Sequence, residues 1–148
     1  IPHTAGLTYL QDKLEKRREK NVPSADLVNM AEYVLKNNIF EFNSTVIKQI
    51  FGTAIGTKFA PPYACIFMDR VGSDFLKNEE VKPLIWLRYI DDIFCVWTES
   101  KEKLISFLDR LNSFHPNLKF TFDMSTKEVN FLDVVVKNNK VYFNKAIF

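Results

Sequence analysis

The feature of this sequence that most constrains its fold is a pair of adjacent carboxylates inside an apolar run. The run extends from Leu87 to Trp97, reads LRYIDDIFCVW, and consists mostly of β-branched and aromatic residues. Such residues favour strands, so we expect one strand from Leu84 to Ile90 and a second from Ile93 to Thr98. Asp91 and Asp92 then lie side by side at the turn of a hairpin, at a sheet edge.

Two neighbouring carboxylates repel each other and are costly to desolvate, so a fold that holds them against an apolar hairpin usually has a cation nearby. Mg²⁺ is the natural cation, because it prefers hard oxygen ligands and is typically held by one or two carboxylates and by substrate phosphates. Mn²⁺ is a possible substitute. A plain polar hairpin tip is the alternative, because Asp is favoured in turns. On this stretch alone, both interpretations of Asp91 and Asp92 stay open.

A second stretch, Gln49 to Arg70, holds two of the four glycines in the chain, Gly52 and Gly56. Glycine permits a positive φ or a close approach to a ligand, and a loop that enters a helix offers amide donors and the positive helix end to an anion. We expect that helix to begin near Ala60, because the two prolines that follow suit a first turn. An ordinary strand-to-helix turn is the alternative. A Walker loop is excluded, because Lys58 is misplaced relative to the glycines.

The rest of the chain alternates helical and strand patterns, which predicts an α+β fold with an antiparallel sheet packed by helices. Ser24 and Ser100 are candidate N-caps for the second and last helices, and Asn43-Ser44 is a candidate hairpin turn. The further expected elements are helices within Thr4–Lys20, after Ser24 and after Ser100, and strands at IFEFN, Val46–Ile50, Leu118–Met124, Val129–Val136 and, after an Asn138-Asn139 turn, Lys140–Phe148.

Composition narrows the class of protein. A chain of 148 residues that is 47% hydrophobic is long enough for one domain with a core, and its net charge of +2 is compatible with a phosphate-bearing partner without requiring one. Cys65 and Cys95 lack a CxxC spacing and are expected to be buried thiols in a reducing compartment. His3 and His115 lie too far apart to suggest zinc ligands. No apolar stretch reaches the length of a membrane helix.

Two motifs, in this order, resemble the palm of a reverse transcriptase. YIDD at Tyr89 to Asp92 resembles the YxDD box at the hairpin tip of that palm, and QxxGTAxGTKxAPxYAxxFM, read on Gln49 to Met68, resembles the substrate-pocket loop and helix before it. The GTAIG form, the opening IPHTAGL and the downstream FHPNLKFTFDMSTKEVNFLDVVV resemble the Penelope-like retroelements, a branch related to telomerase. The resemblance extends from Ile1 to about Val136.

This resemblance implies an RNA-directed DNA polymerase of a retrotransposon, with a palm-like fold and partial fingers. Its reaction is nucleotidyl transfer with two Mg²⁺ ions, which clamp the attacking and leaving oxygens. The implied partners are an RNA template, a DNA primer and deoxynucleoside triphosphates, with no membrane. The implied location is intracellular, with the parent protein in the nucleus.

The resemblance also assigns roles to single residues. Asp91 is the implied metal ligand, Asp92 assists it, and Tyr89 lines the primer end, although a core tyrosine is an equal alternative. Lys127 is the candidate proton donor to pyrophosphate, with Lys119 as its competitor and a plain surface lysine as the alternative to both. Phe131 and Leu132 would belong to a primer-grip hairpin, with a role in the core of a strand as the alternative. The pocket for the incoming nucleotide and template base would be shaped by Gln49, Gly52, Thr53, Gly56, Thr57 and Lys58.

By the same resemblance, residues 1–148 form a single partial reverse transcriptase domain. Residues 1–50 are then connecting helices and a hairpin between fingers and palm, 51–136 the palm core, and 137–148 the start of a thumb-side strand. The family's palm carries another metal-binding aspartate on a strand before the IPHTAGL segment, and Asp12, on the polar side of a helix, does not replace it. We therefore expect this piece alone not to polymerise.

Two other functions compete with this one. The first is a non-catalytic remnant, or a module recruited by a host for nucleic-acid binding or protein interaction. An intact YIDD and an intact glycine loop argue against long decay, because free acids cost stability without their metal. The second is a hydrolase with two carboxylates, which ranks last because neither a His nor a Lys base stands beside Asp91 and Asp92.

Overall fold

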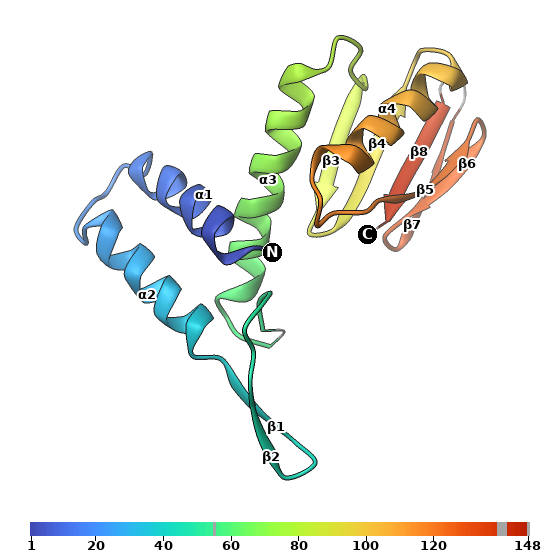
Figure 1. Ribbon diagram of the computed structural model, residues 1–148. Coiled ribbons are helices and arrows are strands. Elements are labelled where there is room, and N and C mark those ends of the chain that lie inside the picture. The colour runs from blue at the N-terminus through green and yellow to red at the C-terminus, as the bar shows by residue number, and fades with distance from the viewer. Residues whose placement is uncertain (55, 139–141, 148) are drawn as a thin grey trace. The chain divides into compact units, whose positions relative to one another are not determined.

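The computed structural model describes residues 1–54, 56–138 and the backbone of 142–147 (Figure 1). The chain divides into two compact units, Ile1–Arg70 and Val71–Phe148, and their boundary falls inside the long helix α3, Ala60–Asn78. The described strands pair antiparallel and the remaining regular structure is helical. The α+β class expected from the sequence is therefore confirmed.

The first unit contains two helices, a hairpin and the first half of α3. One cluster of its core joins four buried residues, Leu10, Ala31, Leu35 and Tyr63, one or two from each of the three helices. Leu10, Ala31 and Leu35 lie at the apolar positions of their amphipathic patterns. The elements before α3 are α1 (His3–Glu15), α2 (Ser24–Lys36), β1 (Ile39–Phe42) and β2 (Thr45–Lys48).

Three details of the first unit differ from the sequence-based expectation. Helix α1 ends at Glu15, so most of the basic run that follows it lies in the connection to α2 and not in the helix. Ser24 is the first residue of α2, and Pro23 takes the N-cap position without a side-chain cap. The apolar residues of α2 recur at helical spacing and predict one core-facing side, made of Leu27, Met30, Ala31, Val34 and Leu35. Met30 is nevertheless 64% exposed, because the unit is too small to cover every turn.

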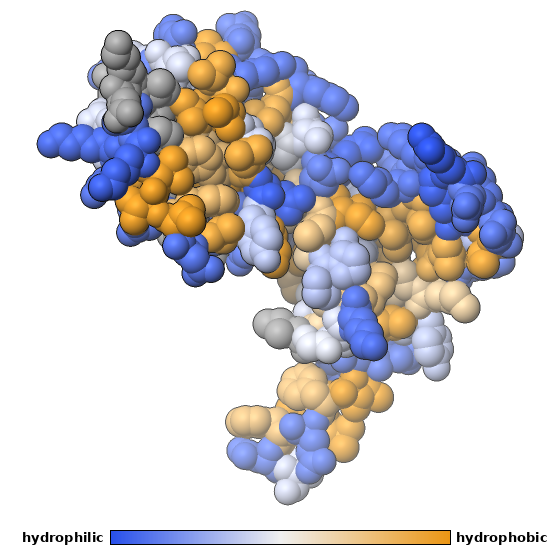
Figure 2. Space-filling model, turned by 180° about the vertical axis from the view of Figure 1, so that it is seen from behind, coloured by the Kyte–Doolittle hydropathy of each residue, from blue (hydrophilic) through white to orange (hydrophobic). Residues whose placement is uncertain are grey.

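The hairpin β1–β2 forms as its turn residues predict. Asn43 and Ser44 have φ of 49° and 57°, and two positive φ values are typical of the type I′ turn that favours asparagine. Most hairpin side chains are exposed, including large apolar ones, which are orange at the bottom of Figure 2. The exposed apolar residues here are Ile39, Phe40, Phe42 and Val46.

The second unit is built on a four-stranded sheet with the strand order β3-β4-β8-β5. β4 is an inner strand, and five of its six residues are buried. A separate hairpin, β6–β7, completes the strands of the unit. The elements are β3 (Ile85–Tyr89), β4 (Asp92–Trp97), α4 (Lys101–Phe114), β5 (Thr121–Ser125), β6 (Glu128–Phe131), β7 (Val134–Lys137) and β8 (Tyr142–Ile147).

Aromatic side chains fill the core on one face of this sheet. Phe107 of α4 is fully buried, and its ring lies 5.1 Å from Phe75 of α3, 5.1 Å from Trp97 and 6.1 Å from Trp86. Ser100 caps α4 as expected, because its hydroxyl accepts a hydrogen bond from the backbone N–H of Lys103 (3.4 Å). The helical spacing of four apolar residues predicts the buried face of this helix, and all four are buried: Leu104, Phe107, Leu108 and Leu111.

The C-terminal part of the sequence was only partly predictable. Val129 to Val136 was expected to be one strand, but it folds back on itself as β6 and β7 around a turn at Leu132 and Asp133. The run contains no Gly or Pro, the residues that usually indicate a turn. The expected Asn138-Asn139 turn falls partly outside the described residues, which include Asn138 but not Asn139, and the expected last strand contains β8.

Candidate functional site

The two acidic residues lie at the turn of the β3–β4 hairpin, close to where the sequence places them. Tyr89 pairs with Asp92, so the two central residues of the turn are Ile90 and Asp91. The expectation that both acids belong to the turn is therefore wrong by one residue, because Asp92 is the first residue of β4. Cross-strand partners point to the same face of a sheet, so the side chains of Tyr89 and Asp92 share a face.

The backbone at this turn is strained. Ile90 has φ of 53°, a conformation that β-branched residues rarely adopt, whereas Asp91 does not have a positive φ. A positive φ at the first central residue alone is typical of a type II′ turn, where glycine is usual. The guanidinium of Arg88 donates to the backbone oxygen of Ile90 (2.7 Å), which helps to hold the turn. Strain of this kind costs about 1 to 3 kcal/mol and is concentrated at functional sites.

We expect Ile90→Gly to be more stable than Ile90→Ala by about 1 kcal/mol, because only glycine adopts a positive φ without penalty. Both variants remove the same partly exposed side chain, so their difference isolates the backbone strain. In an ordinary strand position the order would be reversed. Urea denaturation of the two variants measures this difference, and an equal or greater stability of Ile90→Ala would show that the turn is unstrained.

The environment of the acids leaves them accessible. Asp91 is exposed and Asp92 is half-buried, and the carboxylate of neither residue forms an ion pair or a hydrogen bond with the part of the chain that the structure describes. Tyr89 beside them is 57% exposed. Two hard oxygen ligands without a competing cation suit Mg²⁺. Across residues 1–54 and 56–138, however, no three His, Cys, Asp or Glu side chains come together as a metal site.

A second turn of the same kind lies at the same end of this unit (Figure 1). Leu132 also has φ of 53°, and an aspartate, Asp133, follows it, as Asp91 follows Ile90. The ring of Phe131 packs against Phe94 (5.5 Å between centroids), which anchors β6 over the sheet face that carries Tyr89. The β6–β7 hairpin thus places the exposed Leu132 at the end of the sheet where the acidic turn lies.

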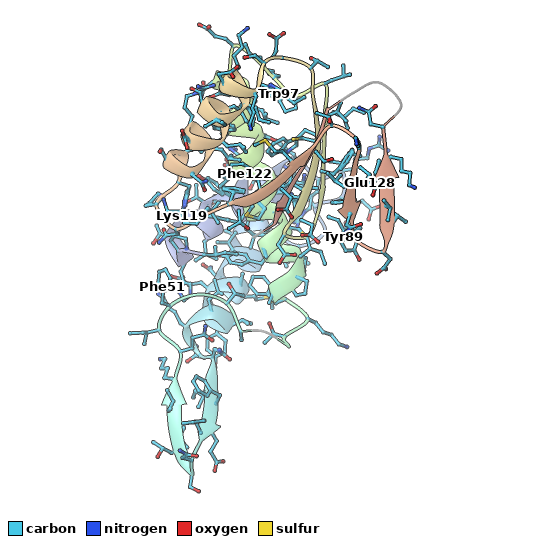
Figure 3. All side chains as sticks on the ribbon, turned by 90° about the vertical axis from the view of Figure 1, so that its right-hand side faces the viewer. Phe51, Tyr89, Trp97, Lys119, Phe122 and Glu128 are labelled. Atoms are coloured by element: carbon cyan, nitrogen blue, oxygen red, sulfur yellow. The ribbon has the colours of Figure 1, made fainter. Side chains whose placement is uncertain are left out.

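The strand register separates the two candidate lysines. β5 runs parallel to β4, since both pair antiparallel with β8, so Thr121 lies level with the start of β4 and Ser125 level with Val96. Lys127 follows Ser125 and is therefore displaced along the strands from Asp92 by more than about 13 Å at 3.3 Å per residue. Lys119 precedes Thr121 and therefore lies near the acidic end of the sheet. Figure 3 labels Lys119 and Tyr89 at a similar height. Its ammonium donates to the backbone oxygen of Asn112 (3.0 Å).

The glycine loop lies in the first unit, between β2 and α3. Gly52 and Gly56 have φ of 82° and 100°, so both glycines adopt the conformation for which the sequence suggested them. The hydroxyl of Thr57 accepts from the backbone N–H of Ala60 (3.2 Å) and donates to the backbone oxygen of Ala54 (3.2 Å). Thr57 therefore caps the start of α3 rather than offering a free hydroxyl.

The other predicted loop residues differ in what they offer a ligand. The Gln49 amide is engaged with the side chain of Asn38 and with the backbone oxygen of Phe51. Thr53 Oγ1 is buried with no hydrogen-bond partner among the described residues, whereas Lys58 is exposed and makes no ion pair with them. Beside the loop is an open groove of about 510 Å³. The groove is lined by Phe40, Ile47, Lys48, Gln49, Ile50, Phe51 and Thr53.

Two residues support this loop: His3, which the sequence analysis considered only as a zinc ligand, and Tyr63, which it predicts on the inner face of the helix after the loop. The Nε2 of His3 hydrogen-bonds to the backbone oxygen of Gly52 (2.7 Å), and the hydroxyl of Tyr63 donates to the backbone oxygen of His3 (3.3 Å). Burial raises the pKa of Tyr63 to about 12. The sequence signal for these contacts is the presence of both IPHTAGL and GTAIG in one chain. Rules based on local patterns do not connect two segments so far apart.

Comparison with protein-family models, with curated proteins and with solved structures finds no match for this chain. Among the described helices, none has both the length and the apolar composition needed to cross a membrane. The acidic turn belongs to the second unit and the glycine loop to the first.

Proposed function

We propose that this chain is part of an RNA-directed DNA polymerase, a reverse transcriptase of a retrotransposon. The observation that carries the proposal is the pair of adjacent carboxylates, Asp91 and Asp92, at an exposed and strained hairpin turn without a cationic partner in the described chain. Two neighbouring carboxylates that are accessible and have no cationic partner among the described residues are available as hard oxygen ligands for a divalent cation. The resemblance of YIDD and of the GTAIG block to the reverse transcriptase palm supplies the reaction.

In this proposal Asp91 and Asp92 hold Mg²⁺, with Asp91 as the principal ligand. The bound metal stabilises charge on the attacking and leaving oxygens of nucleotidyl transfer. Tyr89 and Leu132, both exposed and apolar in large part, form the surface against which the primer end packs. Lys119 lies closer along the strands to the acidic turn than Lys127 does, and its ammonium must leave the backbone oxygen of Asn112 to act as the proton donor.

The glycine loop receives the incoming nucleotide. Its positive-φ glycines bring the backbone close to a ligand, and the unpaired Lys58 is available to phosphates. The exposed rings of Phe40 and Phe51 beside Lys48 fit bases of a single strand, since every base has a face that stacks on an aromatic ring.

The same groove favours a second candidate function, a nucleic-acid-binding module without catalysis. Exposed rings and a nearby lysine bind single strands whether or not a metal is present. The absence of a third acidic or histidine ligand near Asp91 and Asp92 among the described residues is consistent with this alternative. In the reverse transcriptase interpretation the third carboxylate comes from the strand that precedes IPHTAGL in the family.

Metal binding separates these functions. We expect Mn²⁺ to broaden the amide resonances of residues 89–93 and Asp91→Asn to reduce this affinity at least 10-fold, because the metal loses a charged oxygen ligand. The matched control is Asp133→Asn in the β6–β7 turn. Asp133 follows Leu132, whose φ of 53° equals that of Ile90 before Asp91. Equal effects of the two variants would mean that Mn²⁺ binds any acidic turn, and the metal role of YIDD would then be rejected.

Primer extension on an RNA template tests the reaction itself. With Mg²⁺ we expect no incorporation by residues 1–148 alone, and incorporation when the upstream aspartate-bearing strand implied by the family is joined to them. Asp91→Asn should then abolish the reaction and Asp133→Asn should not. Template binding without incorporation by that longer chain would favour the non-catalytic module.

A further inference from the structure

His3 joins the first helix to the glycine loop across 49 residues of sequence. Its Nε2 lies 2.7 Å from the backbone oxygen of Gly52, in a partly buried position. A carbonyl oxygen only accepts hydrogen bonds, so the ring nitrogen that faces it carries the proton. The contact therefore fixes both the tautomer of His3 and the direction of the Gly52 carbonyl.

The main chain of His3 is itself held firmly. The hydroxyl of Tyr63 donates to the backbone oxygen of His3 (3.3 Å), and the Tyr63 ring is 1% exposed and stacked on Phe59 with centroids 5.0 Å apart. Gly6, one turn further along α1, leaves the room that this ring occupies. His3 is thus a rigid donor, because its backbone is fixed by the core of the first unit.

A second side chain holds the preceding carbonyl of the loop. Nε2 of Gln49 donates to the backbone oxygen of Phe51 (2.8 Å), and Gln49 is in turn fixed by the side chain of Asn38. Two successive carbonyls, those of Phe51 and Gly52, therefore each accept a hydrogen bond from a side chain, the first from Gln49 of the same loop and the second from His3 of α1.

Fixing these carbonyls also fixes the N–H groups that follow them. In a trans peptide the C=O and the next N–H point in opposite directions, and the described chain contains no cis peptide. The N–H groups of Gly52 and Thr53 must therefore point away from Gln49 and His3. Neither N–H has a hydrogen-bond partner within residues 1–54 and 56–138. Successive free N–H groups in a turn form a concave site for an anion.

We infer that His3 is a positioning residue for the glycine loop, and that it orients the backbone N–H groups of Gly52 and Thr53 toward a phosphate of the incoming nucleotide. The inference rests on the proposed function for the identity of the ligand, but the positioning itself does not depend on it. The buried Thr53 hydroxyl, which has no partner among the described residues, is a further donor at the same point of the loop.

The test compares two replacements of His3. His3→Gln keeps an N–H donor on a flexible side chain, whereas His3→Leu has a similar volume and no donor. We expect the amides of residues 52–54 to become mobile on the nanosecond timescale in His3→Leu, and to stay ordered in His3→Gln, as measured by ¹⁵N relaxation. The matched control is His115→Leu, which changes the other histidine of the chain, in the second unit.

Binding is measured with inorganic triphosphate and with dATP, followed by the amide shifts of Gly52 and Thr53. We expect His3→Leu to weaken both ligands about 10-fold, and His3→Gln to stay within about 3-fold, given about 1.4 kcal/mol for a tenfold change in affinity. Weaker binding with unchanged loop order would overturn the positioning role. A mobile loop in His3→Leu, together with a wild-type chain that binds neither ligand, would leave the positioning role intact and reject the nucleotide-binding role.

One measurement needs no variant and covers the case in which His3→Leu fails to fold. ¹⁵N shifts of the imidazole in the wild-type chain report which ring nitrogen carries the proton. We expect Nε2 to be protonated at a pH where the ring is neutral, because it faces the Gly52 oxygen. A proton on Nδ1 instead would overturn the inference directly.

Discussion

Gly6→Ala is expected to destabilise the first unit by about 3 kcal/mol, the upper part of the range for overpacking a filled core. A Cβ added at Gly6 would lie 2.0 Å from the hydroxyl oxygen of Tyr63 and 2.5 Å from the ring carbon that bears it. Tyr63 has no room to retreat, because its ring is buried and stacked on Phe59. The ring must leave its place, and its hydrogen bond to His3 is lost with it.

The matched control is Gly72→Ala, at the other glycine that lies in a helix. Its added Cβ would meet nothing closer than Trp86 Nε1 at 3.9 Å, which is ordinary contact. Alanine is the better helix former, so this variant should be more stable than the wild type by about 0.5 to 1 kcal/mol. Opposite signs for the two Gly→Ala changes would identify the clash, and not helix propensity, as the cause.

A second readout follows the displaced ring of Tyr63. Burial raises the pKa of this phenol to about 12, so exposure in Gly6→Ala should lower it toward the value near 10 of a free tyrosine. Ultraviolet titration of the phenolate measures the change, with Tyr63→Phe identifying the signal. A stable Gly6→Ala variant whose Tyr63 still titrates near pH 12 would contradict the packing described for this core.

Parts of this fold were readable from sequence because their signals are local. Ser100 caps α4, the Asn43-Ser44 pair turns β1 into β2, and α3 begins at Ala60 before two prolines. In each case the chemistry of one or two residues determines the backbone conformation within a single turn. The apolar spacing of α4 likewise predicted all four of its buried residues, because one helix face has one packing partner.

The turns with aliphatic residues were not readable in the same way. Ile90 and Leu132 both have φ of 53°, although neither residue type favours that conformation. At Ile90 the strand signals on both sides still revealed the hairpin, and only the position of Asp92 was wrong by one residue. At Leu132 the apolar run is continuous, so nothing local distinguished one strand from two short ones.

The residues of the candidate site likewise differ in whether a local sequence signal reveals them. Asp91 and Asp92 were identifiable because acids inside an apolar strand pattern are unusual, and their exposure agrees with that interpretation. The choice between Lys127 and Lys119 depends on how β4 and β5 align through β8. The residues around either lysine do not reveal this alignment. The contact of His3 with Gly52 was also beyond reach, since it joins residues 49 positions apart. Both features depend on long-range geometry and not on the chemistry of the single residues.

Phe107→Ala is expected to destabilise the second unit by about 4 kcal/mol, within the range for removing a buried phenylalanine. The Phe107 ring is fully buried and lies between α3 and the β3–β4 hairpin, in contact with Phe75, Trp86 and Trp97. Each lost aromatic pair adds about 0.5 to 1.5 kcal/mol beyond the area buried. Trp86 and Trp97 are the two tryptophans of the chain, so fluorescence should shift to the red as their contacts with Phe107 are lost.

This variant also tests how the acidic turn is supported. Trp86 lies on β3 opposite Cys95 of β4, so the aromatic cluster braces the two strands that present Asp91 and Asp92. We expect Phe107→Ala to weaken Mn²⁺ binding at the turn under conditions where the chain remains folded, because the hairpin becomes mobile. Ile105→Ala is the control, since Ile105 is 40% exposed on the same helix and its loss should cost less than about 1 kcal/mol. Full metal affinity in a folded Phe107→Ala variant would mean that the strained turn holds its shape without the core beneath it, and Arg88 and the β6–β7 hairpin would then be its main support.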